Sequence, residues 1–173
     1  KTSSTATTRT YIQGLGAICR QAGHRYEHHV ERGMPLVMQY ARQEDDELKE
    51  HVLQACEAMV SKSGSEISGH IPAIVDLCLE YITYDPNYNY DDGDDSDMEC
   101  DDGDDGSGSD DEYSDDDDVS WKVRRAAAKC IEAVIISRHE MIEQFYKTIS
   151  PALITRFLGV ILNISVIRIF LQV

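Results

Sequence analysis

The sequence has 173 residues, a length that suits one compact domain or a piece of a longer array, and a formal net charge of -16. Seventeen of its 32 acidic residues lie between Asp91 and Asp118, a window without Lys or Arg, so that 15 acids remain elsewhere to face 16 bases. The near-neutral remainder offers no basic stripe for phosphates, which argues against nucleic acid as a direct ligand and favours a basic protein surface as the partner of the acidic run.

The cysteines and the chain ends indicate the cellular setting. Five cysteines without a CxxC pair, four of them at apolar helical positions, predict reduced core residues rather than a disulfide or zinc role. Reduced cysteines are typical of cytosolic and nuclear proteins, so we expect a protein of the cytoplasm and nucleus; no signal peptide is recognised in the sequence. The chain starts at Lys1 without a methionine, and we therefore expect a fragment. The apolar end, residues 158–173, is short for a membrane span and contains Arg168, so no membrane contact is expected.

Apolar residues recur at helical spacing almost throughout, and no convincing strand precedes the tail. The first helix should end near Gly23, and Asp45 or Asp46 should cap the third. The helix after the acidic run has the clearest pattern, with Ser120 or Asp118 as its expected cap. In chain order, the apolar stripes cover about 12–23, 30–41, 48–59, 71–82, 123–135 and 142–157.

The helical pattern repeats. The stretches MPLVMQYA, IPAIVDLC and SPALITRF align on Pro35, Pro72 and Pro151, each of which should lie inside a helix and bend it. The following helices also align: the first proline precedes Leu48 by 13 residues, whereas the second precedes the equivalent Val123 by 51, a difference of 38. Without an insert of that length the period is about 40 residues, which is typical of HEAT repeats.

We therefore predict an all-α fold, a HEAT-repeat (ARM-like) α-solenoid with a disordered acidic loop inserted between the two helices of one repeat. The expected organisation begins with the second helix of a preceding repeat, continues with one uninterrupted and one interrupted HEAT repeat and the first helix of the next, and ends in an atypical tail. The corresponding ranges are 1–23, 24–63, 64–137 with the insert at about 83–119, 138–157 and 158–173.

No pattern in the sequence points to catalysis, to a cofactor or to a structural metal. Residues 101–112 match an EF-hand loop only in part, because Gly103 occupies a ligand position, so weak and nonspecific cation binding is the expectation. His24 and His28 have no third ligand at a defined spacing and should be solvent-facing or helix-terminal. Ser109 and Ser114 each precede an acid by three residues and are candidate phosphorylation sites, although serines also occur in such tracts without modification.

Two aromatic clusters flank the acidic run and are candidate partner-binding residues. Exposed tyrosines leaving a helix suit partner binding, and helix-end packing is the alternative. For the basic cluster the alternatives are an arginine paired with an acid on a neighbouring helix, a partner contact, or a docking point for the acidic loop. The candidates are Tyr84, Tyr88, Tyr90, Trp121, Lys122, Arg124 and Arg125.

The stretches YIQGLGAICRQAGHRY, LEYITYDPNYNYDD, SDDEYSDDDD and SWKVRRAAAKCIEAV, followed by FYKTISPALITRF, resemble the cullin-associated and neddylation-dissociated proteins. The resemblance covers about residues 8–157 and includes the place of the acidic insert. It implies a piece of the N-terminal arm of a long HEAT solenoid. After Phe157 the sequence departs from the family pattern, so we expect residues 158–173 not to be native family sequence.

The resemblance implies a non-enzymatic regulator without a cofactor or a small-molecule substrate. It would bind an unneddylated cullin with its RING subunit, and would promote substrate-receptor exchange and assembly of the ubiquitin ligase. The alternatives are a HEAT-type transport receptor or chaperone for basic proteins and, third, a calcium-responsive enzyme or sensor.

Overall fold

The computed structural model describes residues 4–85 and 119–159, with side chains as far as Thr155. Over these ranges the regular elements are α-helices and short 3-10 helices, without a strand, in agreement with the predicted all-α fold. The elements are α1 (Thr5–Ala22), η1 (Gly23–His29), α2 (Val30–Met38), α3 (Asp46–Lys62), η2 (Ser65–His70), α4 (Ile71–Ile82), α5 (Ser120–Ser137), η3 (His139–Met141) and α6 (Ile142–Gly159).

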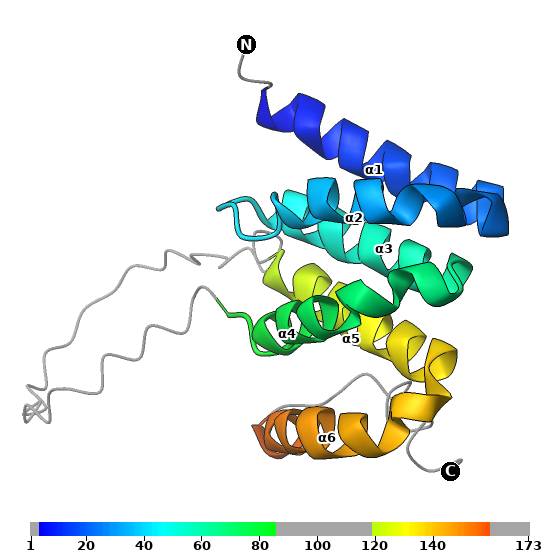
Figure 1. Cartoon of the computed structure of the whole chain (residues 1–173). Coiled ribbons are helices and arrows are strands. Elements are labelled where there is room, and N and C mark those ends of the chain that lie inside the picture. The colour runs from blue at the N-terminus through cyan, green and yellow to red at the C-terminus, as the bar shows by residue number, and fades with distance from the viewer. Residues whose placement is uncertain (1–3, 86–118, 160–173) are drawn as a thin grey trace, which may run out of the picture.

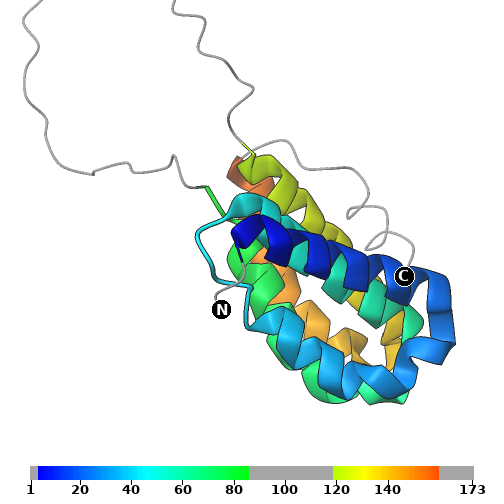
Figure 2. The same cartoon turned by 90° about the horizontal axis from the view of Figure 1, so that it is seen from above.

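The helices are stacked in two layers, as the two views of the ribbon show (Figures 1 and 2). One layer contains α1, α3 and α5, with α3 packed between the other two, and the second layer contains α2, α4 and α6. Each short 3-10 helix connects a helix of the first layer to the next helix of the second. This arrangement is the predicted HEAT-repeat solenoid.

Two of the predicted helix boundaries are confirmed at the level of hydrogen bonds. The Asp45 carboxylate caps α3 by accepting from the Leu48 backbone N–H at 3.0 Å. At Gly23, which follows α1, φ is 57° and the backbone N–H donates to the Cys19 carbonyl. A positive φ favours glycine because it has no Cβ.

The expected cap of α5 was wrong for Ser120. Ser120 is the first residue of the helix and is fully buried. The N-cap position is occupied by Val119, and no side-chain hydrogen bond caps the helix. The Ser120 hydroxyl instead accepts a hydrogen bond from Arg124 Nη1 at 2.7 Å. A buried hydroxyl at this point needs a partner inside the protein, and the arginine one turn later provides one. Asp118, the other expected cap, lies outside the described residues.

The prolines do not all behave as predicted. Pro35 and Pro151 lie inside α2 and α6, but Pro72 occupies the first turn of α4. In a first turn the absent proline N–H costs nothing, since that N–H has no partner within the helix. The predicted apolar stripe of residues 71–82 agrees with α4, but the alignment of Pro72 with Pro35 and Pro151 suggested an interior position for a proline that directly follows the first residue of the helix.

The core lies between the two layers. Gly16 of α1 is packed against α3 so closely that a Cβ there would lie 3.3 Å from Ala55 Cα, which gives this glycine a packing role. Four cysteines are free and buried, as predicted, and burial raises the pKa of the Cys19 thiol to about 11. The fifth, Cys100, lies outside the described residues. The largest fully buried side chains are Met34, Leu48, Leu53, Met59, Ile67, Ile71, Ile74, Leu77, Ile82, Ile131, Ile149 and Leu153.

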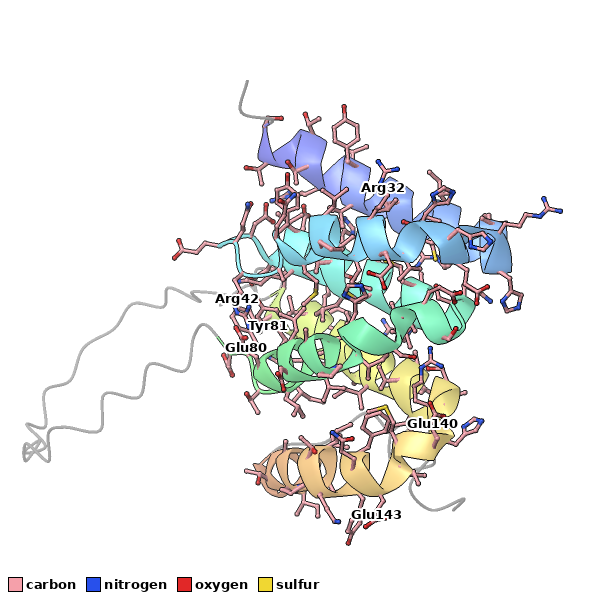
Figure 3. The ribbon with its side chains drawn as sticks, viewed as in Figure 1. Arg32, Arg42, Glu80, Tyr81, Glu140 and Glu143 are labelled. Carbon is pink, nitrogen blue, oxygen red and sulfur yellow. The ribbon has the colours of Figure 1, made fainter. Side chains whose placement is uncertain are left out.

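Polar contacts between neighbouring repeats recur at separations close to the predicted period. Arg42 Nη2 lies 2.8 Å from the Glu80 carboxylate, 38 positions away, and the Tyr81 hydroxyl donates to the Ala41 carbonyl, 40 positions away. Figure 3 shows this cluster at the edge where α4 ends. A carboxylate oxygen of Asp45, 36 positions from Arg9, lies 2.8 Å from Arg9 Nη2. Successive repeats are therefore joined by polar contacts as well as by the core.

Candidate partner-binding surface

The predicted site residues that the structure describes lie at the two points where the chain leaves α4 and enters α5. Tyr84 follows the end of α4, and Trp121, Lys122, Arg124 and Arg125 lie in the first two turns of α5. The remaining predictions, Tyr88, Tyr90, Ser109, Ser114 and the partial EF-hand pattern of residues 101–112, lie outside the described residues.

Tyr84 is tied to the start of α3. Its hydroxyl lies 2.7 Å from Lys49 Nζ and 2.8 Å from an Asp46 carboxylate oxygen, and the Lys49 ammonium also lies 4.3 Å from the centre of the Tyr84 ring. Lys49 and Asp46 form an ion pair at 2.8 Å. The tyrosine therefore joins α4 to α3, in a half-buried position, through its polar end.

The protonation states of Lys49 and Tyr84 follow from burial and from the hydrogen bonds between Lys49, Tyr84 and Asp46. Burial alone would lower the pKa of Lys49, but the hydrogen bonds with Asp46 and Tyr84 outweigh it and raise that pKa. Burial also raises the pKa of Tyr84. At neutral pH the cluster thus contains a charged ammonium and a neutral phenol, which is the state that these contacts require.

Arg124 connects the two chain segments that border the acidic run. Its Nη1 donates to the Tyr84 backbone carbonyl at 2.8 Å as well as to the Ser120 hydroxyl. Tyr84 and Arg124 are 40 positions apart in sequence, with residues 86–118 between them. The hydrogen bond from Arg124 to the Tyr84 carbonyl holds the start of α5 against the residues that follow α4.

The other three predicted residues of α5 face solvent or a groove. Trp121 is 47% exposed, and Lys122 Nζ lies 5.9 Å from its ring centre. Lys122 and Arg125 line a groove of about 260 Å³ between α3 and α5, which α1 also borders. The complete lining is Arg20, Glu50, Gln54, Glu57, Lys122, Arg125, Ala126 and Lys129.

The two walls of this groove carry opposite charge. The α5 wall presents Lys122, Arg125 and Lys129, and the α3 wall presents Glu50 and Glu57. On the α3 side, Gln54 Nε2 donates to Glu50 at 2.7 Å, and Arg20 Nη1 of α1 lies 3.9 Å from Glu57. The carboxylates are therefore in part occupied by neighbours.

Sequence reasoning missed Lys129 and the acidic wall. The signal was available, since Lys122, Arg125 and Lys129 follow the i, i+3, i+7 spacing of one helical face. Aligning the repeats would also have placed Glu50 and Arg125 at equivalent positions of neighbouring helices, because Leu48 aligns with Val123.

The described residues were also compared with the requirements of a metal site and of a membrane-spanning helix. Residues 4–85 and 119–159 contain no group of three or more His, Cys, Asp or Glu placed to hold a metal ion. None of their helices combines the length and the apolar character needed to cross a bilayer. A second hollow, an open depression at η3 and the start of α6, is bordered by Glu140 and Glu143 (Figure 3) and by Lys147.

Comparison with known proteins gives strong matches over most of the chain, although no protein-family model matches it. It is 58% identical over 155 residues to "Cullin-associated NEDD8-dissociated protein 1" of Drosophila melanogaster, covering 88% of this chain and 12% of the relative. It is 51% identical over 156 residues to "Cullin-associated NEDD8-dissociated protein 2" of Mus musculus, covering 90% and 13%. The protein 1 homologue of Arabidopsis thaliana is 46% identical over 153 residues, covering 87% and 13%. The chain therefore spans about one eighth of the length of these relatives.

Proposed function

The chain belongs to the cullin-associated NEDD8-dissociated protein family, and on this premise we propose that it is part of a non-enzymatic regulator that binds cullin–RING ubiquitin ligase scaffolds. The binding partner is the cullin with its RING subunit in the form that lacks the ubiquitin-like modifier. Binding promotes exchange of substrate receptors and assembly of the ligase, in the cytoplasm and the nucleus. The sequence match over 87–90% of the chain is the observation that carries this proposal.

The fold supports this proposal on physical grounds. A stack of helical repeats presents long surfaces to a macromolecular partner. The charge distribution adds a second argument, because 17 acids between Asp91 and Asp118 form a strongly negative segment beside a remainder of charge near zero. Such a segment favours association with a basic protein surface, in a manner that salt screens.

A binding experiment tests the proposal directly. The chain is titrated against a cullin–RING complex with and without the ubiquitin-like modifier, at two salt concentrations. We expect binding to the unmodified complex alone, with an association rate that falls as salt increases. Binding to neither form by the folded chain would refute a contact within this segment, and equal binding to both forms would refute discrimination by it.

A second experiment tests the acidic segment by comparing the native chain with a variant that lacks this segment. A variant in which a Gly/Ser linker replaces residues 86–118 should associate more slowly and lose most of the salt dependence. An unchanged rate and an unchanged salt dependence would show that the acidic segment plays no part in association.

The acidity also favours a second candidate, a transport receptor or chaperone for basic proteins. This function predicts that the chain binds unrelated basic proteins, such as core histones, as tightly as it binds the cullin complex. Binding to the cullin complex without comparable binding to histones would exclude it.

A further inference from the structure

The groove between α3 and α5 contains bases that the rest of the described protein does not engage. Within residues 4–85 and 119–155 the side chains of Arg125 and Lys129 make no ion pair and no hydrogen bond, and the Lys122 ammonium contacts only the Trp121 ring. Nearby carboxylates exist on the opposite wall, but Glu50 and Glu57 interact instead with Gln54 and Arg20. Three cations along one wall are thus available to an external ligand.

The spacing of these charges defines the shape of that ligand. A helix rises 1.5 Å per residue, so Lys122 and Lys129 are about 10 Å apart along α5, and Glu50 and Glu57 are equally far apart along α3. The two helices run side by side in the same direction (Figure 1). Each wall therefore presents charges over nearly two helical turns, which matches the spacing of charges along one edge of a third helix.

The opposite signs of the walls define its chemistry. A ligand that is negative all round, such as a nucleic acid backbone, would meet the carboxylates of Glu50 and Glu57 as it approached Lys122 and Lys129. A helix with acids on one edge and bases on the other meets favourable charge on both walls. Trp121 does not line the groove, but its exposed ring, centred 5.9 Å from Lys122 Nζ, leaves an apolar surface next to that lysine.

We infer that the groove between α3 and α5 is a docking site for a helix of a partner protein, with its acidic edge against Lys122, Arg125 and Lys129 and its basic edge against Glu50 and Glu57. The inference goes beyond the proposed function and does not depend on it. The acidic segment of this chain favours a basic surface, whereas the groove favours a helix with acids on one edge and bases on the other. The contact made by the acidic segment and the contact made by the groove are therefore separate.

A designed peptide serves as the probe. It is an alanine-based helix with glutamates along one edge and lysines along the other, and it is titrated into the full, isotope-labelled chain while amide chemical shifts are recorded by NMR. We expect saturable shifts concentrated on the facing sides of α3 and α5. A peptide of the same composition with both signs mixed on each edge should bind about tenfold more weakly, as should one with glutamates on both edges.

Charge reversal locates the site and includes a matched control. The triple variant K122E/R125E/K129E should weaken peptide binding at least tenfold. The variant R25E/R32E/K147E changes the net charge by the same amount at exposed positions outside the groove, and should bind within about twofold of the native chain. Circular dichroism and melting temperature verify that both variants are folded.

Four results would overturn the inference: no saturable binding by the native chain, equal weakening by both triple variants, equal binding of the ordered and mixed peptides, or binding that appears only after residues 86–118 are removed. Because the probe contains no cullin sequence, these results are independent of the cullin experiment. A chain that fails with the cullin complex could still bind the peptide, and the reverse.

Discussion

At the scale of single residues, one glycine inside α1 and one at its end show how backbone conformation decides the effect of adding a Cβ. Gly14 is in the middle of the helix, and a Cβ at that position would meet nothing within 4 Å. Gly23 follows the helix with φ of 57°, and a Cβ would again find open space. The difference between these two glycines is therefore one of backbone conformation alone.

We predict that Gly14→Ala and Gly23→Ala change stability in opposite directions. Alanine is favoured over glycine inside a helix by about 1 kcal/mol, so Gly14→Ala should raise the free energy of unfolding by about 0.5–1 kcal/mol. Alanine at a positive φ is strained, so Gly23→Ala should lower it by about 1 kcal/mol. Urea unfolding followed by circular dichroism measures both, and changes of the same sign would contradict the argument.

Asp45 provides a pH-dependent prediction. Burial alone would raise its pKa, but the hydrogen bonds from Arg9 and from the Leu48 N–H outweigh it and lower the pKa below its ordinary value. A carboxyl with a lowered folded pKa contributes stability above its unfolded pKa, and that contribution is lost as pH falls through the folded pKa. Asp45→Asn keeps a side chain that can cap α3 but removes the charge.

The stability difference between the native chain and Asp45→Asn should therefore depend on pH. We expect the native chain to be more stable near neutral pH, and the difference to shrink as the solution is made acidic and Asp45 becomes protonated. Urea unfolding at a series of pH values tests this. A difference that stays constant with pH would mean that the cap, and not the charge, carries the effect of Asp45.

At the scale of elements, the sequence predicted the positions of the helices well and the contacts between the helices less well. The position of α3 and its Asp45 cap followed from an apolar stripe and one acid, since both signals are local. The contact of Tyr84 with Lys49 and that of Arg124 with the Tyr84 carbonyl were not predictable in detail, because the partners are 35 and 40 positions apart in sequence. Pro72 was misplaced because it aligns with Pro35 and Pro151, which lie inside their helices, whereas α4 begins only one residue before Pro72.

Tyr84→Phe tests whether the joint between α3 and α4 stabilises the fold. Removing the hydroxyl leaves the ring over Lys49 but removes the two polar contacts with Lys49 and Asp46. We expect the free energy of unfolding to fall by about 1–2 kcal/mol, since these contacts are partly buried and one involves a charge. The control Tyr11→Phe, at a side chain that is 69% exposed, should have almost no effect. Equal effects of the two substitutions would contradict a structural role for the Tyr84 hydroxyl.

At the scale of the whole molecule, the period is the property that a single sequence displays best. The prolines and the paired positions after them gave a repeat of about 40 residues, and cross-repeat contacts at separations of 36, 38 and 40 agree with it. The groove was not predicted, because it needs side chains of α1, α3 and α5 to converge. Convergence of this kind depends on how repeats stack, and composition along the chain does not reveal it.

The acidic insert gives the last prediction, which concerns the stack as a whole. Arg124 Nη1 already holds the Tyr84 carbonyl at 2.8 Å, so the ends of the segment that a linker must join are fixed by the folded repeats. Replacing residues 86–118 with about eight Gly/Ser residues reduces the length of the connection about fourfold. This lowers the entropic cost of closing the loop by about 1.2 kcal/mol, in favour of folding.

The replacement also removes 17 acids and no base, taking the formal charge from -16 to +1. We therefore expect helical circular dichroism per folded residue to be unchanged and the free energy of unfolding to stay equal or rise by 1–2 kcal/mol, as urea titration would show. Loss of helical signal would contradict this expectation, because it would mean that the insert contributes contacts on which α4 and α5 depend.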